Sequence, residues 1–223
     1  MTRRLILTTA RQRGRLTAAQ RSAYEQHGGR LLACPDTLLD WPTVFNSTGN
    51  VVVEIGFGDG DCLRSLAMAH PDWCFLGLEL YKPGVGAALV KCAHANLTNV
   101  RIIHEDVRIV WPMIPNASVA RIHVLFSDPW PKKRTHKRRL LQYDQLCGWL
   151  EKLMPGGILY LATDDASYQT FIEAQVAALS DVAFLDPAQS IFMPNTPKRP
   201  ETKYEQRGRR LGHAVRDWCI KKL

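Results

Sequence analysis

Residues 51–70 read VVVEIGFGDGDCLRSLAMAH, and this stretch decides the fold. The Val- and Ile-rich run at 51–55 is typical of a strand buried on both faces, and the apolar spacing at 61–70 is typical of a helix. Three alternate glycines, Gly56, Gly58 and Gly60, join the two. Glycine permits a tight turn and lets a ligand approach the backbone, so this order predicts a ligand-binding α/β unit rather than a plain turn.

The same alternation of strand and helix continues to about residue 179. Strand patterns occur at 73–80, 100–106, 121–128 and 158–165, and helical patterns at 82–96, 138–154 and 166–179. The strands are rich in Val, Ile and Leu, as in sheets covered on both faces, so the fold class predicted is α/β, with a doubly wound, mostly parallel, Rossmann-like sheet. Near the C-terminus we expect a loop at 194–203 and a strand within 204–220.

Two segments are predicted: a basic N-terminal extension at 1–45 and the α/β domain at 46–223. Within the extension, TAAQ at 17–20 has the form of a capping box and predicts a short helix that starts at Thr17. The first thirty residues hold seven arginines against a single acid, Glu25. Two further basic clusters occupy 132–139 and 198–222, and the net charge is +8. Three basic clusters around a nearly neutral middle favour a polyanionic partner.

Other classes of protein are disfavoured by composition. No apolar run approaches the roughly 20 residues of a membrane span, and the basic start lacks the features of a signal peptide. The six cysteines form no C-x-x-C pair and the seven histidines no clustered ligand spacing, so no metal is indicated. Scattered free thiols favour a reducing, cytoplasmic location.

Acidic residues around the glycine loop discriminate between two cofactors. A dinucleotide site prefers G-x-G-x-x-G, whereas this loop reads G-x-G-x-G with Glu54, Asp59 and Asp61 beside it. Three carboxylates suit the cationic groups of S-adenosylmethionine better than a pyrophosphate. Glu79 ends the second strand, where an acid can accept ribose hydroxyls in either cofactor class, and Asp106 ends the third, near where adenine would be read.

The segment SDPWPKKRTHKRR at 127–139 follows the fourth strand. Ligands of open α/β sheets bind at the carboxyl ends of the strands, so Asp128 is expected beside the transferred methyl group. Pro129 restricts the backbone, and Trp130 offers a plane on which a base can stack. The cations from Lys132 to Arg139 are then expected to face the phosphates of the substrate.

The sequence resembles the bacterial tRNA (guanine-N7)-methyltransferases, which are S-adenosylmethionine-dependent enzymes of class I. The resemblance rests on RGRLTAAQ, EIGFGDG, GLELYKPGVGAAL, SDPWPKKRTHKRR, LATD and TKYEQRGRRLGHAVRDW, and spans about residues 13–218. It implies methyl transfer to N7 of guanosine 46 in the variable loop of tRNA. It also implies that Asp128 is the catalytic residue. The cofactor-binding residues would be Glu54, Gly56, Gly58, Gly60, Glu79, Asp106 and Asp128. The substrate-binding residues would be Lys132, Asp164, Thr202, Lys203, Tyr204 and Glu205.

The chemistry of this transfer needs no general base, because guanine N7 has a free lone pair and no proton. We therefore expect Asp128 to orient the base and stabilise the charge that develops on it. Asp164 is expected to serve the same edge or to cap the helix that follows, with Asp165 as the other candidate cap. Two alternatives are an NAD-dependent oxidoreductase and a non-catalytic RNA-binding partner with this fold. Either a monomer or a homodimer is compatible with the sequence.

Overall fold

An eight-stranded sheet forms the centre of the computed structural model, in the order β1-β4-β3-β2-β5-β6-β8-β7. The structure describes residues 14–26, 30–32, 34–188, 192–194, 196 and 198–223. The strands are β1 (Leu31–Leu32), β2 (Val51–Ile55), β3 (Cys74–Leu78), β4 (Val100–Ile103), β5 (Val119–Leu125), β6 (Leu153–Thr163), β7 (Val182–Leu185) and β8 (Arg216–Lys222). Strands β1 to β6 all run parallel to the strands with which they pair within this group. Strand β8 lies between β6 and β7 and is antiparallel to both. The predicted class, an α/β fold with a mostly parallel sheet, is confirmed.

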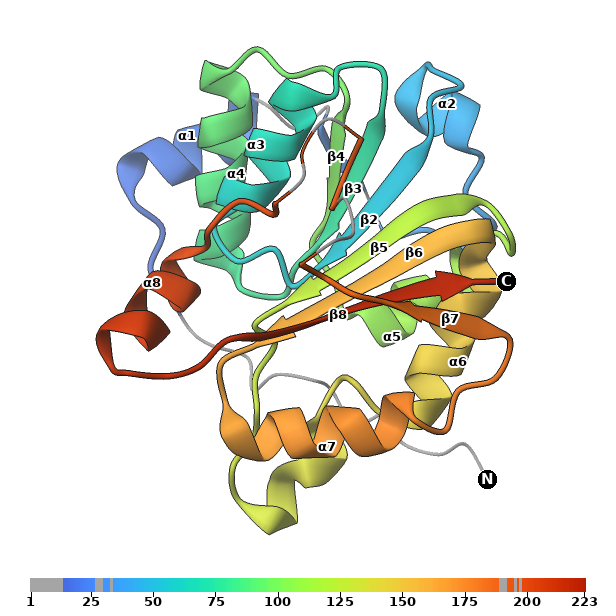
Figure 1. Ribbon diagram of the computed structural model, residues 1–223. Coiled ribbons are helices and arrows are strands. Elements are labelled where there is room, and N and C mark those ends of the chain that lie inside the picture. Colours follow the sequence, from blue (N-terminus) through green and yellow to red (C-terminus); the bar gives the residue numbers. More distant parts are fainter. Residues whose placement is uncertain (1–13, 27–29, 33, 189–191, 195, 197) are drawn as a thin grey trace, which may run out of the picture.

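Helices cover both faces of this sheet (Figure 1). The α-helices are α1 (Ala18–Gln26), α2 (Trp41–Phe45), α3 (Asp61–Ala69), α4 (Lys82–His94), α5 (Val107–Val110), α6 (Tyr143–Lys152), α7 (Ala166–Val176) and α8 (Lys203–Arg210), and the 3-10 helices are η2 (Trp111–Met113) and η3 (Lys133–Arg138). One face carries α1, α3 and α4, and the other carries α5, α6 and α7. Among the described helices none is long and apolar enough to cross a membrane.

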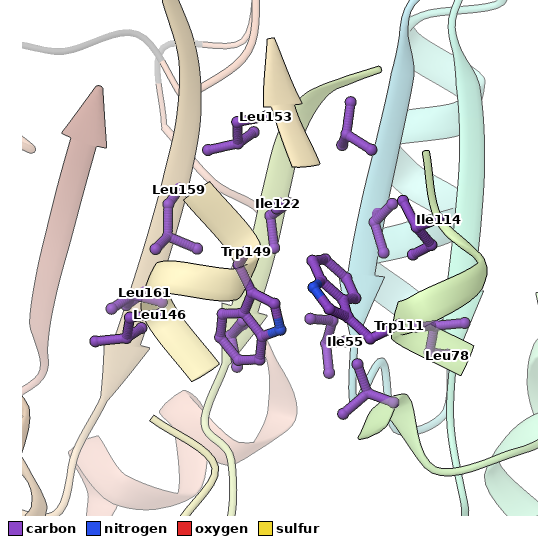
Figure 2. Packing of buried hydrophobic residues seen from close by; sticks show 14 of the residues in the cluster. Ile55, Leu78, Trp111, Ile114, Ile122, Leu146, Trp149, Leu153, Leu159 and Leu161 are labelled. Carbon is purple, nitrogen blue, oxygen red and sulfur yellow. The ribbon is translucent and has the colours of Figure 1, made fainter. Parts of the chain in front are cut away.

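The core consists of two apolar layers, one on each side of the sheet. All five residues of β2 and of β3 are buried, which explains why their sequences are apolar without alternation. In the layer between the sheet and α6, Trp149 of α6 meets Trp111 edge to face, with ring centroids 5.8 Å apart (Figure 2). Each fully buried large side chain contributes on the order of 2 kcal/mol, so these layers hold the strand ends in place.

The described part of the N-terminal segment packs on the same sheet. Thr17 and Gln20 form the predicted capping box, with each side chain accepting the other residue's backbone N–H at 3.2 and 2.9 Å. Gln20 also donates to the Pro83 carbonyl on α4, at 3.0 Å. Strand β1 pairs with β4. The arginines at 3, 4, 11 and 13 lie outside the described residues, and the division at residue 45 stays a prediction.

The C-terminal segment differs from the prediction. Residues 203–210 form a helix, and the expected strand begins only at Arg216. Thr202 starts this helix by accepting the backbone N–H of Glu205 at 3.2 Å. In the sequence, Thr202 with Glu205 three positions later has the form of a capping box and marks the start of this helix. Strand β7 was also not predicted, because this edge strand is short and only partly buried.

Candidate functional site

A cleft of about 340 Å³ opens at the carboxyl ends of the central strands. It lies where the glycine loop after β2, the end of β3, the turn before α5 and the loop after β5 meet, with α8 at its side. This is the edge at which open α/β sheets bind ligands. The lining residues are Ile55, Gly56, Gly58, Leu78, Glu79, Leu80, Tyr81, Glu105, Val107, Phe126, Ser127, Asp128, Trp130, Arg138, Leu140 and Tyr204.

The glycine loop needs its glycines. Gly56, Gly58 and Gly60 have φ angles of 73°, 61° and 77°, a region that other residues rarely adopt. A Cβ atom on Gly60 would also lie 2.6 Å from the Cβ of Ala88 on α4, so the loop and this helix pack without side chains between them. A Cβ on Gly56, by contrast, would meet nothing within 4 Å. The backbone at Gly56 therefore borders open space that a ligand can fill.

Glu79 lies in the cleft and is held by three backbone N–H groups. Its carboxylate accepts from Gly58 at 2.8 Å, from Leu80 at 2.6 Å and from Tyr81 at 2.8 Å. Burial raises the pKa of Glu79, and these hydrogen bonds lower it in part, so that it remains above its ordinary value. The side chain is thus fixed directly after β3, the position that the sequence predicted, whereas its contact with ribose hydroxyls stays a prediction.

Glu54 and Asp106 are buried behind the cleft rather than among its lining residues. Glu54 is 2% exposed, and burial raises the pKa of its carboxyl to about 8. The hydrogen bond with Cys62 lowers this pKa in part, and the charge of Glu79 raises it further. Glu54 is therefore mostly protonated at neutral pH. Asp106 caps α5 by accepting the backbone N–H of Arg108 at 2.9 Å, and its neighbours in sequence line the cleft instead.

The other two acids of the glycine loop are neutralised by lysines. Lys91 on α4 lies 3.2 Å from Asp59 and 2.6 Å from Asp61, and Lys203 on α8 pairs with Asp59 as well. Although burial raises the pKa of Asp59, its hydrogen bonds with Lys203 and Lys91 bring the value below normal. In the free protein the carboxylates of Asp59 and Asp61 are thus paired with lysines, and that of Glu54 is buried.

Asp128 lies in the cleft, on a loop with unusual backbone geometry. Burial raises the pKa of its carboxyl. Phe126 and Trp130 flank it with φ angles of 55° and 45°, a left-handed conformation that is costly for aromatic residues. The guanidinium of Arg138 lies over the Trp130 ring, 4.9 Å from its centroid. Strained residues of this kind cluster at functional sites, where the surrounding structure holds them.

Helix α8 places one of its predicted substrate residues on the cleft. Tyr204 lines it and is half exposed. Thr202 instead caps the helix, and Lys203 pairs with Asp59. Glu205 is buried and pairs with Arg199 and, at 2.8 Å, with Arg209.

The remaining predicted substrate residues lie outside the lining of the cleft. Lys132 is exposed and precedes η3. Asp164 lies 3.2 Å from the ring of His213 and directly beside Gly208. Asp165, not Asp164, caps α7 by accepting the N–H of Tyr168 at 2.8 Å. Asp164 is thus not used as a helix cap.

Sequence reasoning missed several residues. Tyr81 and Glu105 line the cleft, and Arg199 joins α8 to β8 through Glu205 and, at 2.7 Å, Asp217. The motif GLELYKPGVGAAL contains Tyr81 but does not indicate its role, and no quoted motif contains Glu105 or Arg199. One expectation was also wrong: Arg139, counted with the phosphate-facing cations, is buried. Among the described residues no group of His, Cys, Asp and Glu side chains could hold a metal ion.

Comparisons with known proteins indicate the family. Residues 48–218 match the family model described as "Putative methyltransferase". The tRNA (guanine-N(7)-)-methyltransferase of Sodalis glossinidius is 40% identical over 228 residues, covering 98% of this chain and 92% of its own. The enzyme of the same name from Thiobacillus denitrificans is 40% identical over 211 residues, covering 94% and 92%. That from Alcanivorax borkumensis is 41% identical over 212 residues, covering 94% and 88%.

Solved structures share the fold. The 16S rRNA methyltransferase KamB superposes with a TM-score of 0.54 at 18% identity, covering 84% of this chain and 95% of that one. A 16S rRNA (adenine(1408)-N(1))-methyltransferase from Catenulisporales acidiphilia, solved with cosubstrate SAM, gives 0.52 at 19% identity, covering 84% and 93%. With near-complete coverage at 40% identity to the curated relatives, the chain belongs to the tRNA (guanine-N(7)-)-methyltransferase family.

Proposed function

We propose that the protein transfers a methyl group from S-adenosylmethionine to N7 of guanosine 46 in the variable loop of tRNA. The observation that carries this proposal is the position of Asp128 in a cleft that also holds the glycine loop and Glu79, in a chain of this family. A tRNA substrate would also place the reaction in the cytoplasm.

The cleft fits S-adenosylmethionine. Gly56 leaves its backbone open to a ligand, and Glu79 presents a fixed carboxylate at the end of β3. We assign direct contact with the cofactor to Gly56, Gly58, Glu79 and Asp128, which line the cleft, and a supporting role to Glu54, Gly60 and Asp106. Glu54 and Asp106 act from behind the cleft, by supporting the loops on which the lining residues lie. When bound, the cofactor supplies an activated methyl group on a cationic sulfur.

Asp128 has an orienting and electrostatic role. Guanine N7 carries its lone pair in the ring plane, so no group has to remove a proton before attack. The purine becomes positively charged as the new N–C bond forms. A partly buried carboxylate beside it stabilises that charge more strongly than one in water would, and it can accept a hydrogen bond from the guanine edge. Holding the base in line can contribute several kcal/mol in addition.

The substrate side combines stacking with charge. We assign base stacking to Tyr204 and Trp130, which line the cleft, and phosphate binding to exposed cations that include Lys132. Lys203 pairs with Asp59 in the free protein, and it becomes available to tRNA only if this pair opens. Thr202 and Glu205 shape α8, and Asp164 supports it at Gly208.

The direct test is a product analysis. Purified protein is incubated with labelled S-adenosylmethionine and two tRNA transcripts that differ only in guanosine or adenosine at position 46. Digestion should release labelled 7-methylguanosine from the first transcript and none from the second. Labelled 7-methylguanosine from both transcripts would show that the target is a guanosine other than position 46. No labelled product from either transcript would overturn the proposed function. Binding of NAD without binding of S-adenosylmethionine would favour the oxidoreductase alternative.

A further inference from the structure

Arg139 differs from the other cations of the basic run at 132–139. Its side chain is 2% exposed, whereas Lys132, Lys133, Arg134 and Lys137 are exposed. A buried guanidinium cannot reach a phosphate in solvent without leaving its site. Its contacts therefore indicate what it does in the folded protein.

The guanidinium of Arg139 is held between a loop and a helix. Its Nε donates to the carbonyl of Pro129 at 2.8 Å, and its Nη2 donates to Ser167 Oγ on α7 at 3.3 Å. It also lies over two aromatic rings of α7, 5.2 Å from the centroid of Tyr168 and 4.7 Å from that of Phe171. Aromatic faces stabilise a cation by electrostatic attraction, which compensates part of the loss of water.

Tyr168 connects the same helix to Ser127, the residue before Asp128, and to Leu141. Its hydroxyl accepts the backbone N–H of Leu141 at 3.1 Å and lies 3.4 Å from Ser127 Oγ. Ser127 and Pro129 are the two neighbours of Asp128. Arg139 and Tyr168 therefore attach both flanks of this residue to α7.

The loop needs such attachment because its backbone is strained. Phe126 and Trp130 have positive φ angles of 55° and 45°. Residues in this region persist only where their surroundings over-determine them. The Pro129 carbonyl bound by Arg139 immediately precedes Trp130, so the bond holds the strained peptide itself.

We propose that Arg139 is a positioning residue for Asp128, acting through Pro129 and α7, and that it does not bind RNA. The expected effect of Arg139 on kcat rests on the proposed methyl transfer. Its expected effect on the order of residues 126–139 can be measured without any substrate.

Kinetics separates positioning from phosphate binding. Arg139→Gln should lower kcat at least tenfold while KM for tRNA and its salt dependence stay within twofold of wild type. Arg139→Lys keeps the charge but lacks the planar fork and stacking surface, so it should be as defective. The matched control is Lys137→Gln, an exposed cation of the same run. Its effect should fall on KM, with the slope of log affinity against log salt reduced by about 0.7–0.9.

Two kinetic results would overturn the proposal. One is a wild-type kcat in Arg139→Gln together with a raised KM for tRNA and a reduced salt slope. The other is full activity in Arg139→Lys, because a phosphate contact needs only the charge. If Arg139→Gln does not fold, as judged by a cooperative urea transition, Arg139→Lys carries the same comparison.

Hydrogen exchange tests the structural part independently of catalysis. In substrate-free protein, peptides that cover residues 126–139 should exchange faster in Arg139→Gln than in wild type or Lys137→Gln, whereas peptides from β2 and β3 should not change. Unchanged exchange at 126–139 would overturn the proposal. If wild-type protein gives no 7-methylguanosine, the proposed function fails, and the exchange result still decides the role of Arg139.

Discussion

The burial of Glu54 predicts how strongly the free energy of unfolding depends on pH. The folded-state pKa of about 8 lies above the ordinary value of 4.5, so the native protein holds a proton that the unfolded chain releases between these values. The contribution of Glu54 to stability is therefore fully present below pH 4.5 and is lost as the pH rises towards 8 and through it. The loss is about 1.4 kcal/mol per pH unit within this window, or about 3 kcal/mol at pH 7.

Glu54→Gln removes the titrating group and keeps the shape. The free energy of unfolding, from urea titrations of cofactor-free protein between pH 5 and 8, should fall with pH more steeply in wild type than in Glu54→Gln. The other titrating groups cancel in the difference, and any pH-independent cost of the amide only offsets the curves. The slopes should differ by about 1.4 kcal/mol per pH unit. Parallel curves would refute the claim that Glu54 is protonated in the native protein.

The remaining predictions concern α8. Arg199→Met should lower the free energy of unfolding by roughly 3 kcal/mol in urea titrations, because it removes the buried cation that joins Glu205 to Asp217 and leaves the buried carboxylate of Glu205 with only the exposed Arg209. The exposed Arg207→Met should stay within about 0.5 kcal/mol, and equal losses in both would contradict the role of the buried pair. Gly208→Ala places a Cβ against the carboxylate of Asp164 and should displace α8, so a thermal midpoint and tRNA affinity equal to wild type would argue against this packing.

The sequence predicted the parts of the fold that depend on local pattern. The continuous apolar runs of β2 and β3 and the capping box at Thr17 need only neighbouring residues, and all are confirmed. The helix at 203–210 was missed because a basic, polar segment has no apolar period, and it is held in part by the pairing of Glu205 with Arg199, a residue outside the helix. Short edge strand β7 likewise depends on its partner β8 rather than on its own residues.

The sequence predicted which strands of the site end in acidic residues. Glu79 and Asp128 do line the cleft. The direction in which each side chain points is a tertiary property, and so Glu54 and Asp106 lie behind it. Arg139 shows the same limit, because a run of cations in sequence does not reveal that one of them stacks on buried aromatic rings. Charge counts therefore favour a kind of partner but do not give the role of each cation.

One measurement tests the central claim most directly: single-turnover methylation of a guanosine-46 tRNA transcript by wild type and by Asp128→Asn, with cofactor affinity measured by calorimetry on the same samples. The account predicts 7-methylguanosine as the product of wild type. It also predicts a rate at least a hundredfold lower in Asp128→Asn, with cofactor affinity within a few fold, because the amide keeps the shape of the cleft but not its charge. A near wild-type rate in Asp128→Asn would contradict the account.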